Sequence, residues 1–330
     1  MSRSKHVGEG HPNESPARGQ AHRPTENGCA LEAAKNVLFS CIDSSSSAVR
    51  IHEAGSERVV QASRARISRR RIPIPREHGA WAVFYGSALI PLLAACSLGL
   101  KEVLFLSAAS GFFLAHQPLS RLLRVRKGTP GAGHAAWWRL WLLIYLAVGL
   151  ACGLALLTRY GLWELCLIGG LAALFFGLHL LQVRGKKERQ VAGEVIGIVG
   201  LTATAPAAQV VAQSRLDESA ALIWSLCFLY FASSIFYVKM RVSRFVKKED
   251  PRRRTLHNIL YHAGLVVVVG ALWTGGLIGR LIALAYLPIV SRAFWYLREP
   301  SARLNLQVIG YSEIAFTLWF VIFTTVGWAS

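Results

Sequence analysis

Acidic residues are scarce in this chain of 330 residues, and aspartate is the scarcest of them. Asp and Glu together number 18, against 37 Lys and Arg, and the three aspartates are Asp43, Asp217 and Asp250. They all lie outside the long apolar stretches of the sequence. Paired aspartates that hold Mg²⁺ and a diphosphate are therefore missing, because hard cations need several carboxylate oxygens together.

Other signatures of chemistry are missing as well. The six cysteines include no CxxC pair and have no histidine at ligand spacing, so we interpret them as small packing residues rather than metal ligands. The sequence contains no P-loop, GxSxG, HExxH or dinucleotide-binding motif, and no nucleophile is identified. These absences leave both the cofactor and any catalytic residue unknown.

Charged residues make up only 17% of the chain, below the quarter or so that is usual in a soluble domain. The net charge of +19 would suggest nucleic acid in a soluble protein, but here the basic residues cluster between apolar stretches. No zinc-finger or RNP-like pattern supports a nucleic-acid partner. Membrane lipid, through its anionic headgroups, is the partner that this distribution favours.

What the sequence has in abundance is apolar stretches of about 20 residues, the length that a helix needs to cross roughly 30 Å of hydrocarbon. They predict an all-α, polytopic bundle of about nine membrane-spanning helices. The expected helices cover residues 79–98, 102–119, 139–157, 162–181, 193–211, 220–238, 259–273, 277–296 and 306–328.

The stretch from Pro73 to Trp81 separates two different parts of the chain. Residues 1–70 are rich in Ser, Arg, Glu and Gly, without the apolar core of a signal peptide, and we expect them to be disordered. Residues 72–328 form the expected transmembrane domain. Because Pro suits the start of a helix and not its interior, the first helix is expected to begin near Arg76.

Lys and Arg are concentrated in every second connection between these helices. Counted from residue 64, one set of connections, with the helix ends that adjoin them, carries 26 of them and the other carries four. Cytoplasmic loops carry the excess of Lys and Arg in membrane proteins. The pattern predicts a protein of the plasma or inner membrane, with its N-terminus in the cytoplasm and its C-terminus outside.

Polar and ionisable residues gather near the expected cytoplasmic ends of the helices, whereas the opposite half shows no comparable set. We take them as a candidate pocket that opens to the cytoplasm and binds a ligand. Its members are Glu77, His78, Glu194, Tyr237, Lys239, His262, Arg292 and Glu313.

Glu313 is the member placed deepest, roughly 10 Å along its expected helix at 1.5 Å per residue. A carboxylate near mid-helix costs about 2.5–3.5 kcal/mol on insertion scales, so it needs a cation, a proton or water. Arg292 is the expected partner, because the connection between the two helices is short. A structural ion pair and a functional one remain equally open at this point.

Spacing adds detail to this set. Ser234, Tyr237 and Arg241 share one helix face at i, i+3 and i+7, and Asn258 and His262 share another at i and i+4. Glycines beside Glu194 favour close helix packing over ligand space. The mixture of carboxylates with Arg, Lys and His suits an anionic headgroup, a phosphate or a carboxylate, or a proton relay.

Several stretches resemble the YwiC-like family of bacterial integral membrane proteins. They are residues 76–81 (REHGAW), 233–241 (SSIFYVKMR), 261–262 (YH), 287–293 (LPIVSRA) and 309–314 (IGYSEI). The likeness covers about residues 72–328, and Val83 stands where the family often has Met. The resemblance implies a multi-pass membrane protein and no particular activity.

Nine helices with a cytoplasmic polar pocket also resemble the architecture of UbiA-type intramembrane prenyltransferases. The aspartate-rich motifs of that family have no counterpart here, so none of their residues carries over, and architecture alone does not establish function. Three hypotheses follow. The first is a protein that binds or transports a small anionic, isoprenoid-like or lipid-like ligand, the second is a prenyl or lipid transferase, and the third is a scaffold subunit. Whether the protein is an enzyme stays open.

Overall fold

Helices make up almost all of the described part of the chain. The computed structural model describes residues 72–75, 78–96, 99–124, 134–185, 190–243, 250–298 and 306–330. The expectations for residues 1–70 and for Glu77 lie outside these residues, and of His78 only the backbone is described. Residues 72–330 form one compact unit.

The helices follow one another with short connections, and no strand occurs between residues 72 and 330 wherever the structure describes the chain. They are α2 (His78–Ala94), α3 (Leu100–Arg124), α4 (Ala135–Tyr160), α5 (Glu164–Arg184), α6 (Val191–Thr202), α7 (Thr204–Gln213), α8 (Glu218–Ser243), α9 (Pro251–Thr274), α10 (Arg280–Ala285), α11 (Leu287–Arg298) and α12 (Leu306–Ala329).

Eight helical segments of the described chain are long and apolar enough to cross a membrane, and Gly79–Ala94 is a shorter apolar helix. The prediction of an all-α polytopic bundle is therefore confirmed. α9 begins at Pro251, eight residues earlier than expected. Hydropathy missed this start because the first residues of α9 are polar, although Asp250 caps the helix by accepting a hydrogen bond from the Arg252 N–H at 2.9 Å.

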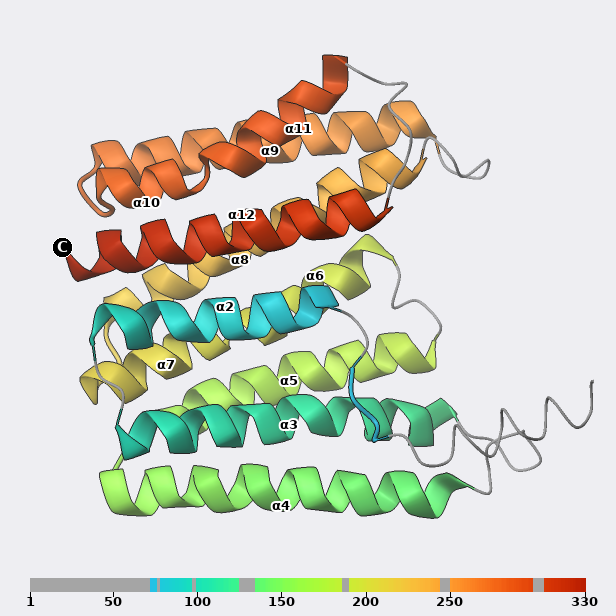
Figure 1. The fold of residues 1–330 in the computed structure, drawn as a ribbon, viewed down its shortest axis with the longest axis vertical. Coiled ribbons are helices and arrows are strands. Elements are labelled where there is room, and N and C mark those ends of the chain that lie inside the picture. The colour runs from blue at the N-terminus through green and yellow to red at the C-terminus, as the bar shows by residue number, and fades with distance from the viewer. Residues whose placement is uncertain are drawn as a thin grey trace, which may run out of the picture. The chain divides into compact units, whose positions relative to one another are not determined.

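Two of the expected helices are interrupted where a proline follows. α6 ends at Thr202 and α7 begins at Thr204, just before Pro206, and the break between α10 and α11 at Tyr286 comes just before Pro288. Proline has no N–H to donate and its ring collides with the carbonyl four residues earlier, so a continuous helix is disfavoured at both places. In each case the second helix, α7 or α11, continues in the direction of the first, so that the two together make one crossing (Figure 1).

Successive membrane crossings run in opposite directions (Figure 1). We call the side on which α2 begins the N side, and the side on which α12 ends the C side. α4, α6, α9 and α12 also begin on the N side, and α3, α5, α8 and α11 end there. The expected cytoplasmic ends of the helices are thus all on the N side.

The packing centres on α2 and α8. α2 contacts α6, α7 and α12, while α8 contacts α6, α7 and α9. Buried aliphatic and aromatic side chains around Tyr230, Ile282 and Phe320 form one core, and a second core surrounds Leu92, Phe105 and Leu156. α9 packs against both α8 and α11, so the ends of these three helices lie near one another on the N side, where α12 also begins.

Candidate ligand-binding site

Arg292 of α11 and Glu313 of α12 form an ion pair inside the N-side half of the bundle. The Nη1 atom of Arg292 lies 2.5 Å from Oε1 of Glu313, and the Arg292 side chain is only 5% exposed, against 25% for Glu313. The second carboxylate oxygen, Oε2, accepts a hydrogen bond from the Ser234 hydroxyl of α8 at 2.6 Å. The expected partnership of Arg292 and Glu313 is confirmed, and it joins three helices.

Aromatic rings enclose the guanidinium group of Arg292. Its Cζ atom lies 3.9 Å from the ring centre of Tyr237 and 5.0 Å from that of Phe316. A guanidinium over an aromatic face is attracted by the negative face of the ring, more strongly where water is excluded. These contacts hold the orientation of Arg292 independently of its bond to Glu313.

The donors of Arg292 are only partly used. Its Nε and Nη2 atoms are buried and have no hydrogen-bond partner among the described residues. Their N–H bonds point from the same edge of the planar guanidinium, the edge that binds two oxygens of a carboxylate or phosphate side by side. Glu313 contacts Nη1 at the other end of the group, and the described residues leave the two-donor edge without a hydrogen-bond partner.

α9 contributes a second group of buried polar atoms. His262 is fully buried, and its Nδ1 atom lies 2.9 Å from the Asn258 carbonyl, which can only accept, so Nδ1 carries a hydrogen. Nε2 of His262 and both side-chain atoms of Asn258 have no partner among the described residues. His262 is close enough to Arg292 for the two groups to interact electrostatically. These atoms therefore belong to the surroundings of Arg292.

A chain of rings and cations continues toward the N side. The rings of Tyr237 and Tyr296 have centres 5.8 Å apart, and Cζ of Arg241 lies 4.4 Å from the centre of Tyr296. Arg241 is buried, at 3% exposure. A second cation thus lies one ring beyond Arg292 on the same side of α8.

The Glu194 and Lys239 pair lies elsewhere around α8. Nζ of Lys239 is 3.1 Å from Oε1 of Glu194 on α6, and both side chains are partly exposed. Tyr237 and Lys239 are two residues apart, about 200° around the helix axis, so they leave α8 in different directions. The structure thus groups Tyr237, His262, Arg292 and Glu313, and it joins Glu194 to Lys239 as a separate pair.

Four residues near this cluster were not in the expected set, namely Ser234, Arg241, Asn258 and Phe316. Ser234 and Arg241 share the face of Tyr237 through the i, i+3 and i+7 spacing, and Asn258 shares the face of His262, so sequence spacing did signal these three. Phe316 lies one turn beyond Glu313 on α12, and an aromatic residue in an apolar helix carries no signal of its own.

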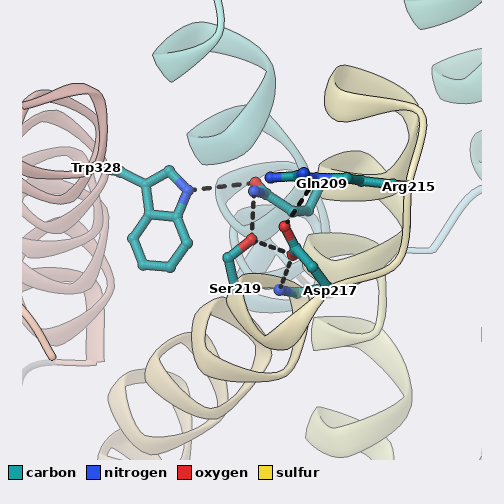
Figure 2. A network of polar contacts seen from close by, with 6 residues as sticks. Gln209, Arg215, Asp217, Ser219 and Trp328 are labelled. Carbon is teal, nitrogen blue, oxygen red and sulfur yellow. Dashed lines mark hydrogen bonds and ion pairs between the residues drawn. The ribbon is translucent and has the colours of Figure 1, made fainter.

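The C side also holds a polar network, contrary to the expectation of a half without one (Figure 2). Gln209 of α7 is buried, and its Nε2 atom donates to the Ser219 hydroxyl at 2.8 Å. Its Oε1 atom accepts from the Trp328 indole of α12 at 3.3 Å. Ser219 donates in turn to Asp217, whose other oxygen lies 3.3 Å from Nε of Arg215. Both ends of the buried amide are satisfied, as a structural clamp requires.

Asp217 lies just before α8 and caps it, accepting a hydrogen bond from the Ala220 N–H at 3.3 Å. The hydrogen bond from Ser219, together with those from the backbone and the charge of Arg215, holds the pKa of Asp217 below its ordinary value of 3.8. The carboxylate is therefore ionised at neutral pH and stabilises the start of the helix.

An open groove of about 460 Å³ lies elsewhere, along α2, α3 and α4. Its lining is mostly apolar, with the Tyr85 and Ser110 hydroxyls 2.9 Å apart. Its lining residues come from helices other than those that carry Arg292 and Glu313. It is therefore separate from the Arg292 cluster.

Metal ligands are not grouped in the part of the chain that the structure describes. No three or more His, Cys, Asp or Glu residues there lie close enough to hold a metal ion. The transferase hypothesis of the UbiA type gains no support from these residues and stays a prediction.

Comparisons with known proteins agree with the sequence resemblance. The family model described as YwiC-like protein matches residues 74–209. No curated protein and no solved structure matches the chain. The C-terminal stretches of the resemblance lie beyond the matched residues, and so do Arg292 and Glu313. Over residues 74–209 the chain is therefore similar to YwiC-like proteins, and its long apolar helices support a multi-pass membrane protein.

Proposed function

We propose that this membrane protein binds, and moves across or along the membrane, a small anionic or lipid-like ligand whose oxyanion docks on Arg292. The observation that carries the proposal is the buried two-donor edge of Arg292, formed by Nε and Nη2. A buried donor without a partner costs about 1–3 kcal/mol, and more when it is charged. A ligand that brings two oxygens to this edge removes that cost.

The surroundings of Arg292 support a ligand rather than a purely structural pair. A structural Arg–carboxylate pair gains most when the two groups meet through two parallel hydrogen bonds. Here Ser234 holds one oxygen of Glu313 and only Nη1 of Arg292 holds the other. The polar atoms of Asn258 and His262 add donors and an acceptor on the next helix for hydroxyl or amino groups of the same ligand.

The test uses the full-length protein in mild detergent, with thermal unfolding followed at increasing concentrations of inorganic phosphate, octanoate and dodecyl phosphate. At a ligand concentration of 100 times Kd, binding stabilises the folded state by about 2.7 kcal/mol. We expect Arg292→Lys to lose this stabilisation, because an ammonium group cannot present two parallel donors. Asp217→Asn, on the C side, should keep it.

The three probes separate the sources of the oxyanion. Stabilisation by dodecyl phosphate alone indicates a lipid headgroup, whereas stabilisation by inorganic phosphate as well indicates a soluble anion. If no probe stabilises the wild-type protein, or if Arg292→Lys responds as the wild type does, the proposal is wrong.

The orientation belongs to the same proposal. The excess of Lys and Arg on the N-side connections supports an N side that faces the cytoplasm of a plasma or inner membrane, so that the cluster opens inward. A reporter that is active only outside the cytoplasm, fused after Ser330, should be active, and the same reporter fused within residues 244–249 should be inactive. The reverse pattern would overturn the orientation.

A further inference from the structure

We infer that an oxyanion bound to Arg292 brings one proton to Glu313, so that the protein takes up its ligand as an acid. This inference rests on the proposed function and adds the chemical class of the ligand, an acid, and its coupling to protons. The carboxylate of Glu313 acts as an internal anion that Arg292 holds until a ligand arrives.

Charge balance is the first argument. Without ligand, the cation of Arg292 and the carboxylate of Glu313 sum to zero within 2.5 Å of each other. A second anion on Nε and Nη2 of Arg292 gives this pair a net negative charge, and an unbalanced charge within the bundle is strongly unfavourable. Two carboxylates at one site also favour protonation of one of them. One proton from bulk water, added to the Glu313 carboxylate, restores a sum of zero.

Geometry supports Glu313 as the group that takes the proton. Its side chain is 25% exposed, whereas Arg292 behind it is 5% exposed, so Glu313 is the more accessible member. Oε2 of Glu313 lies 2.6 Å from the Ser234 hydroxyl. A hydroxyl both donates and accepts, so Ser234 can hold the carboxylate as a donor and the carboxylic acid as an acceptor. The proton therefore arrives without the loss of this contact.

Arg292 itself can stay in place. The rings of Tyr237 and Phe316 hold its guanidinium on their faces, and they do so whether or not Glu313 carries a charge. A guanidinium also keeps its proton in proteins, so Arg292 does not compete as the group that titrates. Protonation weakens only the Nη1 bond and leaves the two-donor edge oriented for the ligand.

Other titratable or charged groups face this pair from the neighbouring helices. They are Tyr230, Tyr237 and Arg241 of α8, His262 of α9 and Tyr296 of α11, with the Glu194 and Lys239 pair between α6 and α8. His262 is the main competitor for the proton, since its Nε2 atom is an acceptor without a partner among the described residues. The experiment must therefore separate Glu313 from His262.

The experiment measures the heat of binding to the full-length protein in two buffers that differ in ionisation enthalpy. The probes are octanoate and octane-1-sulfonate, whose own charges are constant between about pH 6.5 and about pH 9. The wild-type protein should take up about one proton per bound anion. Its Kd should rise about tenfold per pH unit, as linkage of one proton to binding requires.

Variants assign the proton. Glu313→Gln should bind both probes without proton uptake and without pH dependence. His262→Gln should keep the uptake of about one proton per bound anion whatever its affinity, and the C-side control Asp217→Asn should keep both the affinity and the uptake. Because Glu313→Gln leaves Arg292 without a counter-charge, this variant is purified in the presence of octane-1-sulfonate. The number of protons that the wild-type protein takes up per bound anion tests the inference without any variant.

Each result has a distinct meaning. Binding by the wild type without proton uptake overturns this inference and leaves the proposed function intact. Loss of uptake in His262→Gln, with uptake kept in Glu313→Gln, overturns the assignment to Glu313. Failure of both anions to bind the wild-type protein at any pH overturns the inference together with the proposed function.

Discussion

The two polar networks of this membrane protein differ in how completely their atoms are paired. On the C side, both ends of the buried Gln209 amide are bonded, and Asp217 meets Ser219, Ala220 and Arg215. On the N side, Glu313 is held at both oxygens, yet two nitrogens of the buried Arg292 have no partner among the described residues.

This difference supports the ligand-binding role proposed for the N side and a structural role for the C side. Buried polar groups in folded proteins are paired as a rule, and each exception needs an explanation. The Gln209 network joins α7, α8 and α12, and its paired hydrogen bonds are accounted for by holding these helices together. The Arg292 cluster joins α8, α11 and α12 but leaves two donors without a partner among the described residues, as the proposed oxyanion site requires.

The largest effect is expected at the ion pair. Glu313→Leu leaves Arg292 buried without its counter-charge and should destabilise the protein by about 3–5 kcal/mol, measured by thermal unfolding in detergent. Adding Arg292→Met removes the cation as well, so the double variant should recover most of the lost stability. It should also show no stabilisation by octanoate. A double variant that still responds to octanoate would remove Arg292 from the site.

Breaking the clamp should have a smaller effect on stability and none on binding. Gln209→Leu leaves the Trp328 N–H without its acceptor and the Ser219 hydroxyl without its donor, and it should destabilise the protein by about 1–3 kcal/mol. Its response to octanoate, relative to its own melting temperature without the anion, should equal that of the wild type. A weakened response would mean that the two networks are coupled.

Acid should weaken the C-side network. Because the pKa of Asp217 is lowered on folding, its contribution to stability is fully present above its unfolded value of 3.8 and is lost as pH falls through its lower folded pKa. Melting temperatures measured below about pH 4 should therefore fall more steeply for the wild type than for Asp217→Asn. The loss of this helix cap is expected to amount to about 1 kcal/mol. If the melting temperatures of the two proteins fall in parallel with pH, the Asp217 carboxylate does not contribute to stability.

The smallest effect is expected at the partly exposed pair of Lys239 and Glu194. Glu194→Gln should change stability by less than about 1 kcal/mol, because solvent screens ion pairs of this kind. The difference in stability between Glu194→Gln and the wild type, measured by thermal unfolding, should stay below this value at both low and high salt. A loss comparable to that of Glu313→Leu would show that the pair is part of one continuous buried site.

Much of the fold could be predicted from local sequence. Apolar stretches of membrane length identified the crossings, and Pro206 and Pro288 explain the two interruptions. The early start of α9 was missed, although Asp250 and Pro251 are a good helix-start signal, because its polar first turns escape a hydropathy criterion. The partnership of Arg292 with Glu313 followed from the short connection between neighbouring helices.

Contacts between distant segments could not be predicted in this way. Gln209 and Trp328 are 119 residues apart, and Ser234 and Glu313 are 79 apart. The six members of the expected set whose side chains are described lie in two groups, because Tyr237 and Lys239 leave α8 in different directions and Lys239 forms an ion pair with Glu194.

The sequence by itself determined that this chain crosses a membrane many times as helices, since hydrocarbon leaves the backbone no other way to satisfy its hydrogen bonds over these lengths. The tertiary structure alone decided which polar atoms are paired and which are not. Pairing depends on the rotation and approach of neighbouring helices, which local residue patterns do not specify. The free edge of Arg292 is therefore a property of four packed helices rather than of any single stretch.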